Sequence, residues 1–151
     1  MIKKEQNISK LSAALENYLE AVAALKKEKK YARIGDIAKF LDVKSSSVNV
    51  AINFLAENGL VVHEKYGYVD LTEEGERVAE EIQKKHDILY KFLNELLFID
   101  GDIAAKEACE IEHSVSAETI RKLERLYKLL KEHFLTKAED MENLQEYLNG
   151  R

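Results

Sequence analysis

The residue types best suited to binding a metal ion gather in one short stretch, Cys109-Glu110-Ile111-Glu112-His113. In a helix, Cys109, Glu112 and His113 stand at positions i, i+3 and i+4 and therefore share one face. A thiolate, a carboxylate and an imidazole that converge on one face supply three ligands for a divalent transition metal. This spacing makes the helix a candidate for a metal site.

Other helices add further candidate ligands. His86 falls within the apolar stripe of a predicted helix, and Glu20 follows Asn17 by three residues, so those two share a face. Each residue also has an ordinary structural interpretation. His86 suits a hydrogen-bonded core histidine, Glu112 half of an ion pair, and Cys109 a small core residue. Spacing alone leaves the two interpretations open.

A second group of residues is suited to DNA contact. The predicted order of helix, short helix, tight turn, helix and hairpin is that of a winged helix-turn-helix. Its third helix would place short side chains in the major groove, Ser and Asn on phosphates or base edges and Val50 on a thymine methyl. The predicted contacts on and beside this helix are Lys44, Ser46, Ser47, Asn49, Val50 and Asn53.

The remaining predicted DNA contacts lie outside the third helix. They are Lys65 and Tyr66 near the tip of the wing, and Arg33 just before the second helix. The reading helix has no Arg, so backbone contacts and DNA shape are expected to supply much of the affinity. Helix-turn-helix units also serve as protein–protein modules, and the pattern leaves that alternative open.

Apolar residues at helical spacing predict the elements that position both groups. The first helix runs from Ile8 to about Glu28 and the second from Gly35 to Leu41. The third is capped by one of the serines 45–47 and ends near Asn58. Strands at 60–63 and 68–71 form the wing. The second half is predicted helical over 72–97, 103–113, 116–130 and, weakly, 137–148, with Gly101 as a break.

The fold class predicted from these elements is mainly α. A winged helix-turn-helix DNA-binding domain with a small β-hairpin wing occupies residues 1–71, and an all-α metal-binding and dimerisation domain occupies 72–151. Charge follows this division. Residues 1–70 carry 11 Lys and Arg against 9 Asp and Glu, whereas residues 71–151 carry 12 against 19. The charge of the first half suits DNA and that of the second half attracts cations. The charged residues of both halves are equally compatible with an ordinary solvated surface.

Composition indicates a cytoplasmic globular protein. Hydrophobic residues make up 46% of the 151 and charged residues 34%. We expect no membrane partner, because no apolar run approaches the roughly 20 residues that cross a bilayer. The polar N-terminus has no secretory signal, and the single cysteine, Cys109, cannot form an internal disulfide.

Several stretches together resemble the diphtheria toxin repressor and manganese transport regulator (DtxR/MntR) family of metal-dependent repressors. The similarity runs from about Leu11 to Phe134. The most specific match is Ile111-Glu112-His113-Ser114-Val115-Ser116 downstream of the wing. Other matching stretches are Glu16–Glu20, Ala32–Ala38, Ser45–Val48, Asn58–Val61, Leu71–Gly75 and Lys85-His86. The chain is similar to short members without the SH3-like third domain.

The resemblance implies that His86, Cys109, Glu112 and His113 are metal ligands, and that Glu20 matches an acidic ligand of the manganese-responsive branch. Asn17 stands where that branch has an aspartate and the iron-responsive branch a methionine, so it is a doubtful ligand. Cys109 favours Fe(II) and Glu20 favours Mn(II), with Fe(II) slightly preferred. Co(II), Ni(II) and Zn(II) are expected to bind in vitro.

The function expected from this resemblance is repression of metal-homeostasis genes by a homodimer that binds operator DNA when Fe(II) or Mn(II) is bound. Metal is expected to set the spacing of the two reading helices. A metal-independent winged-helix regulator that responds to another ligand or protein is the alternative. A metalloenzyme is not expected, because no further base, nucleophile or phosphate loop accompanies the cluster.

Overall fold

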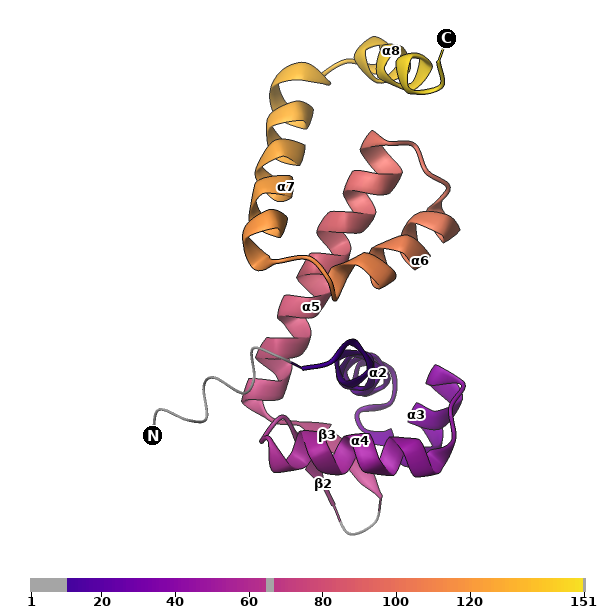
Figure 1. The fold of residues 1–151 in the computed structure, drawn as a ribbon, viewed down its shortest axis with the longest axis vertical. Helices are drawn as coiled ribbons and strands as arrows, with labels where there is room; N and C mark the ends of the chain where they lie inside the picture. Colours follow the sequence, from indigo (N-terminus) through magenta and orange to yellow (C-terminus); the bar gives the residue numbers. More distant parts are fainter. Residues whose placement is uncertain (1–10, 65–66, 151) are drawn as a thin grey trace. The chain divides into compact units, whose positions relative to one another are not determined.

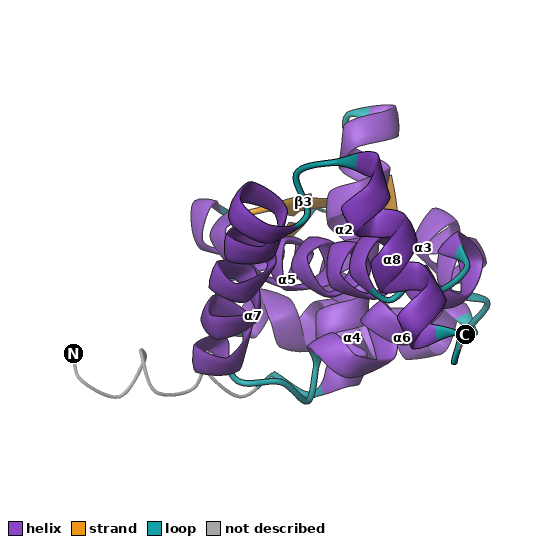
Figure 2. Cartoon of the chain, turned by 90° about the horizontal axis from the view of Figure 1, so that it is seen from above, coloured by secondary structure: helices purple, strands orange, loops and turns teal. Residues whose placement is uncertain are grey.

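The computed structural model describes residues 11–64 and 67–150 and divides into two compact units, one ending at Gln83 and the other starting at Lys84. In the described ranges helix predominates and strand is confined to one small sheet (Figures 1 and 2), which confirms the mainly-α prediction. The division between units lies inside helix α5, Glu73–Lys91. The predicted domain boundary after Leu71 stays a prediction.

Three helices form most of the first unit: α2 Ala13–Lys29, α3 Ile34–Leu41 and α4 Ser45–Glu57. The Oγ atom of Ser12 accepts a hydrogen bond from the amide of Leu15 and begins α2. The predicted start of this helix at Ile8 lies outside the described residues. A left-handed Asp42 (φ 53°) ends α3 and reverses the chain toward α4.

The predicted serine cap of the third helix is wrong. Lys44 is the N-cap of α4, and its side chain makes no capping hydrogen bond. Extended backbone at Lys44 lets its carbonyl accept the amides of Ser47 (2.9 Å) and Val48 (3.2 Å). The helix therefore begins at Ser45, and the serines lie inside its first turn.

The wing is a three-stranded antiparallel sheet in the order β1-β3-β2. Strands β2, Val61–His63, and β3, Tyr68–Leu71, confirm the predicted hairpin. Strand β1, Ala32–Arg33, pairs with β3, although the sequence predicts only the entrance to a helix there. Two residues are too few to show an alternating pattern, so only tertiary pairing reveals β1.

The core of the first unit joins α2, α3, α4, the sheet and the start of α5. Its fully buried side chains include Leu19, Ile37, Ile52, Leu55 and Leu60. Such close packing of three helices against a wing holds the outward face of α4 in place, which is the requirement for a reading helix.

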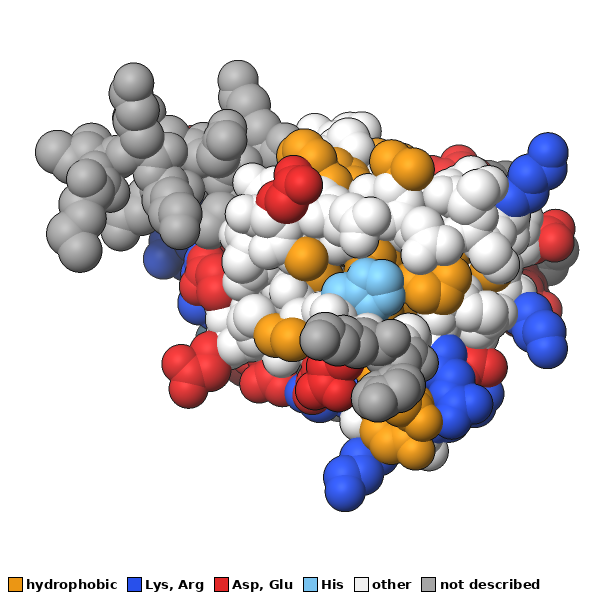
Figure 3. Space-filling model, turned by 90° about the horizontal axis from the view of Figure 1, so that it is seen from below, with side chains coloured by type: hydrophobic (Ala, Val, Ile, Leu, Met, Phe, Trp, Pro, Cys, Tyr) orange, Lys and Arg blue, Asp and Glu red, His pale blue; other side chains and the backbone are white. Residues whose placement is uncertain are grey.

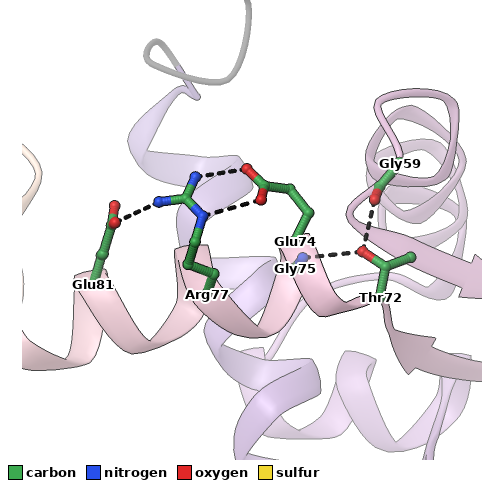
Figure 4. A network of polar contacts seen from close by, with 6 residues as sticks. All are labelled: Gly59, Thr72, Glu74, Gly75, Arg77 and Glu81. Carbon is green, nitrogen blue, oxygen red and sulfur yellow. Dashed lines mark hydrogen bonds and ion pairs between the residues drawn. The ribbon is translucent and has the colours of Figure 1, made fainter. Parts of the chain in front are cut away.

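Thr72 joins the wing to α5, as Figure 4 shows. Its hydroxyl donates to the Gly59 carbonyl (2.6 Å) and accepts from the Gly75 amide (3.0 Å). Gly75 must lack a side chain, because a Cβ there would lie 1.8 Å from the Leu60 carbonyl oxygen. One turn later, Arg77 bonds Glu74 through two guanidinium nitrogens (Figure 4), and this hydrogen bonding lowers the pKa of Glu74.

The second unit is helical throughout its described residues. After the end of α5 come a π-helical turn η1 Phe92–Leu96, α6 Gly101–Glu112, α7 Ala117–Leu129, a second π-helical turn η2 Leu130–Phe134 and α8 Ala138–Leu148. A small core forms around Leu89, Ala108 and Ile120. The Oγ atom of Ser116 accepts from the Thr119 amide, which confirms the predicted cap of α7.

The predicted break at Gly101 is misplaced. Gly101 is the first residue of α6, and Asp100 caps that helix by accepting the amides of Asp102 and Ile103. The interruption lies before it, where Phe98 adopts a positive φ of 55°. Among the described helices, none has both the length and the apolar character needed to cross a bilayer.

Candidate metal centre and nucleic-acid interface

A buried carboxylate lies at the centre of the candidate metal site. Glu112, the last residue of α6, has only 1% of its side chain exposed, and it is the buried charged residue of the described core. Burial of an isolated carboxylate costs several kcal/mol, because the charge loses its hydration without gaining a compensating partner. Such a group is retained where cations or metal ligation compensate its charge.

Two imidazoles flank this carboxylate. The Nδ1 atom of His86, on α5, lies 2.8 Å from Glu112 Oε2. The Nε2 atom of His113 lies 3.5 Å from Glu112 Oε1, and the His113 side chain is only 9% exposed. Helix α6 positions Glu112 and His113 by ending at this point, while the buried Ala108 and Leu89 pack together in the core beneath.

Cys109 completes the cluster from one turn earlier on α6. Its Sγ atom, a carboxylate oxygen of Glu112 and an imidazole nitrogen of His113 all lie within 4.8 Å of one another. That spread suits one transition-metal ion; Zn(II), for example, binds sulfur at about 2.3 Å and nitrogen at about 2.0–2.1 Å. The donor set of one thiol, one carboxylate and two imidazoles therefore fits a divalent transition metal. Cys109, Glu112 and His113 lie together and His86 contacts Glu112, whereas the role of all four as metal ligands stays a prediction.

Glu20 and Asn17 belong to the first unit. Both lie on α2 and both are half-buried. Helical spacing places them on one face, as predicted. Their role as metal ligands stays a prediction from the sequence.

The predicted reading helix presents its predicted contacts to solvent. Lys44 and the α4 residues on the side opposite the core are exposed, and they are Ser46, Ser47, Asn49, Val50 and Asn53. The opposite stripe, Val48, Ala51, Ile52 and Leu55, is buried. Burial therefore separates the two faces as the helical period requires.

Two of these polar side chains bond within the unit. The Asn49 amide nitrogen donates to the Ser45 carbonyl (3.0 Å). Asn53 Oδ1 lies 3.4 Å from Nδ1 of His63, which links α4 to strand β2 of the wing. Any hydrogen bond from these two asparagines to a DNA base would therefore use amide groups that already take part in hydrogen bonds within the protein.

At the wing, Arg33 is held by aromatic residues. Its guanidinium donates to the Tyr68 hydroxyl (2.8 Å) and lies 4.9 Å from the centre of the Tyr68 ring. Tyr31 packs edge-on against that ring at 4.5 Å. Hydrogen bonding to Tyr68 raises the pKa of Arg33, and a guanidinium is in any case always charged in proteins. Lys65 and Tyr66 lie outside the described residues.

Two residues at this surface are not among the contacts predicted from the sequence. Phe54 is 45% exposed on the outward face of α4, one turn after Val50. Its place at i+4 from Val50 was the available signal. Tyr68 was assigned to a strand, and its contact with Arg33 depends on the pairing of β1 with β3, which no local pattern indicated.

Known families match both units. The model of the iron-dependent repressor N-terminal DNA-binding domain matches residues 10–69, and that of the iron-dependent repressor metal-binding and dimerisation domain matches residues 72–134. The HTH-type transcriptional regulator MntR of Shouchella clausii is 30% identical over 133 residues, 88% of this chain and 92% of that protein. This chain belongs to the DtxR/MntR family.

Further relatives agree with this membership. An uncharacterized HTH-type transcriptional regulator of Methanocaldococcus jannaschii is 33% identical over 85% of this chain and all of that protein. The structure of IdeR from T. acidophilum is 30% identical with a TM-score of 0.67, over 74% of this chain and 53% of that one. The structure of a manganese-dependent transcriptional repressor in complex with manganese is 28% identical with a TM-score of 0.69, and the match covers 75% of this chain and 52% of that one. The chain thus spans about half the length of these two solved structures.

As a member of the DtxR/MntR family, the chain is a metal-dependent, DNA-binding transcriptional repressor and not an enzyme. The comparison confirms the predicted winged helix-turn-helix fold and does not favour the metal-independent alternative. A divalent metal is the effector class of the family.

Proposed function

We propose that this chain is a homodimeric repressor of metal-homeostasis genes that binds operator DNA when Fe(II) or Mn(II) occupies the cluster formed by His86, Cys109, Glu112 and His113. The observation that carries the proposal is the buried Glu112 carboxylate, flanked by His86 and His113. Such a repressor acts on the chromosome, which in a bacterial or archaeal cell is in the cytoplasm.

The donor types support a transition metal. Carboxylate alone favours Mg(II), Ca(II) or Mn(II), whereas imidazole and thiolate favour later, softer ions. The cluster holds one oxygen donor against two nitrogens and one sulfur, so we favour Fe(II) slightly over Mn(II). When bound, the metal supplies positive charge and directional bonds that fix the mutual positions of its ligands.

The residues of the chain supply the rest of the proposed function. Glu112 and the two histidines hold the effector, and Glu20 is a further candidate ligand. The first unit supplies the DNA-reading face of α4, with Lys44 and Arg33 as phosphate contacts and Ser46 and Ser47 near base edges. Metal-dependent coupling between the two functions needs only about 1–3 kcal/mol to change DNA affinity by about 5–150-fold.

Operator binding by ligand variants tests the proposed site. A duplex is first selected from a randomised library by the protein in Mn(II), and affinity is then measured by fluorescence anisotropy at fixed salt under anaerobic conditions. Salt must be fixed because it alone shifts such affinities by orders of magnitude. His86→Ala and Glu112→Gln are expected to remove the metal-dependent gain in affinity and to retain the helical circular dichroism spectrum.

The chain offers matched controls for both changes. Glu110 lies two residues before Glu112 without sharing its burial, and His133 is exposed in η2, so Glu110→Gln and His133→Ala should keep the metal response. Persistence of that response in both ligand variants would show that the site lies elsewhere. Equal operator affinity of the wild-type protein before and after EDTA treatment would contradict the proposed function itself.

A further inference from the structure

The outward face of α4 is apolar at positions where charge would strengthen DNA binding. Val50 is 72% exposed and Phe54 is 45% exposed, and the two lie one helical turn apart. From Ser45 to Ala56 the helix contains no charged residue, and Glu57, its last residue, is the first to carry a charge. Figure 3, a view from below, shows hydrophobic side chains beside a histidine near the middle, with both acidic and basic side chains toward the edges.

Internal hydrogen bonds already use part of the polar groups with which the outward face of α4 could contact base edges. The Asn49 amide already donates to the Ser45 carbonyl, and the Asn53 oxygen is engaged by His63. The commonest specific contact to DNA, a bidentate Arg or Lys on guanine, has no candidate on α4. Val50 and Phe54 are therefore the large apolar side chains that α4 exposes beside its short polar ones, and they supply groove contacts that need no hydrogen bond.

B-DNA offers one apolar feature in the major groove, the 5-methyl group of thymine. A protein surface would also suit an apolar face, but the position of α4 favours DNA. It follows the turn of the helix-turn-helix within the segment that matches a DNA-binding domain, and Lys44 with Ser46 and Ser47 stand at its N-terminal end. Those side chains suit phosphates and base edges.

We propose that Val50 and Phe54 read operator DNA by apolar contact with thymine methyl groups. This inference rests on the proposed function, because it requires operator binding by α4. It assigns to Phe54 a specificity role and gives α4 a code based on methyl groups in place of charged hydrogen bonds. Operators should accordingly carry thymines at fixed positions where α4 lies in the groove.

Replacement of thymine by uracil tests the proposal, because uracil keeps every hydrogen-bonding group and lacks only the methyl. The probes are the duplex selected in Mn(II) and copies with single thymines replaced by uracil. Burial of one methyl group accounts for about a four-fold change in affinity. Wild-type protein should bind each critical uracil duplex about four-fold more weakly.

The variants Val50→Ala and Phe54→Ala identify the side chains responsible. Each substitution should weaken binding to the thymine duplex. At the thymine that the replaced side chain contacts, the variant should bind the thymine and uracil duplexes equally, because the methyl group has lost its partner. Phe40 on α3, 54% exposed, supplies the matched control, and Phe40→Ala should keep the wild-type ratio. Both substituted residues are exposed, so unchanged thermal unfolding is expected.

The outcomes separate this inference from the proposed function. Equal wild-type affinity for thymine and uracil duplexes overturns the inference and leaves the repressor function standing. A wild-type thymine-to-uracil ratio in Val50→Ala or Phe54→Ala overturns the role of that residue, and unchanged DNA binding by both would assign the face to a protein partner. Failure to select any duplex in Mn(II) or Fe(II) contradicts the proposed function.

Discussion

Burial distinguishes Glu112 from the many acidic residues around it. Residues 71–151 carry 19 Asp and Glu, and Glu112 is the one that the described core buries. Glu110, two positions earlier on α6, keeps contact with solvent, whereas Glu112 faces inward against His86. A carboxylate in this setting gains from any cation held nearby, because low local polarity strengthens the attraction.

Cys109 is the residue on which metal preference depends. Substitution Cys109→Ser replaces a soft sulfur by a hard oxygen, so affinity for Fe(II), Co(II) and Zn(II) should fall by about 10-fold or more while Mn(II) changes less. Competition titrations of each metal under anaerobic conditions measure the shift. In wild-type protein, Co(II) should also show a sulfur-to-metal charge-transfer band, and the band should vanish in the variant. Equal spectra would exclude Cys109 as a ligand.

At the scale of the elements, contacts of Thr72 and Gly75 at the start of α5 determine how this helix packs against the end of the wing. Thr72 bridges Gly59 and Gly75, and the absence of a side chain at Gly75 allows the helix to approach the Leu60 carbonyl. These contacts are local in space but join the end of α4, the wing and α5. They explain why a threonine begins this turn and a glycine ends it.

Gly75→Ala tests this close approach. Because its Cβ would collide with backbone, we expect a loss of about 1–3 kcal/mol in the free energy of unfolding, or more. At Gly35, in α3, a Cβ would meet no neighbouring heavy atom within 4 Å, and the backbone φ is not positive. Gly35→Ala should therefore be neutral or stabilise by up to about 1 kcal/mol. Urea unfolding of the two variants measures the difference, and equal stabilities would contradict the packing.

Burial of Tyr127 on α7, together with its hydrogen bond to Glu95 in η1, is expected to make the stability of the second unit depend on alkaline pH. Burial, and then the bond to Glu95, raises the pKa of Tyr127 from 10.0 to about 12. The folded state thus keeps the phenolic proton more tightly than the unfolded chain. The resulting stabilisation is complete below pH 10 and is lost as pH rises toward 12.

The measurement is stability against pH for wild-type protein and Tyr127→Phe. Wild-type protein should lose stability over this alkaline range, and the variant should lose less, because it has no proton to release there. Tyr147, 80% exposed on α8, provides the matched control, and Tyr147→Phe should follow the wild-type profile. Identical profiles for wild-type protein and Tyr127→Phe would contradict the assignment.

At the scale of the whole molecule, the uneven charge of the two halves agrees with their proposed roles, DNA binding for the first half and metal binding for the second. Residues 1–70 have a small excess of Lys and Arg, whereas residues 71–151 are strongly acidic. The acidic half repels phosphates and attracts cations, and the first half is left to meet the DNA. Overall net charge, which is -5, conceals this arrangement.

Metal removal tests how the dimer and the effector are related. Since we place dimerisation in the second half and regulation in the cluster, EDTA should abolish operator binding and leave the dimer mass unchanged. Analytical ultracentrifugation with and without Mn(II) measures the mass, and anisotropy on the same samples measures DNA binding. A monomer after chelation would mean that metal acts through assembly and not through a preformed dimer.

Much of the fold was predictable because periodicity is a local property. Alternating burial in α4, the hairpin of β2 and β3, and the cap of α7 at Ser116 all follow from residues close together in the chain. The convergence of Cys109, Glu112 and His113 follows from helical spacing in the same way.

Contacts between distant residues were decided only by the tertiary structure. The 2.8 Å approach of His86 to Glu112 joins two helices, and pairing of β1 with β3 places Tyr68 under Arg33. The start of α4 at Ser45 and of α6 at Gly101 depends on backbone geometry at Lys44 and Asp100, which residue type alone does not specify. Local sequence determines which face of each element is apolar, whereas packing determines which faces meet, because that choice minimises exposed surface over the whole unit.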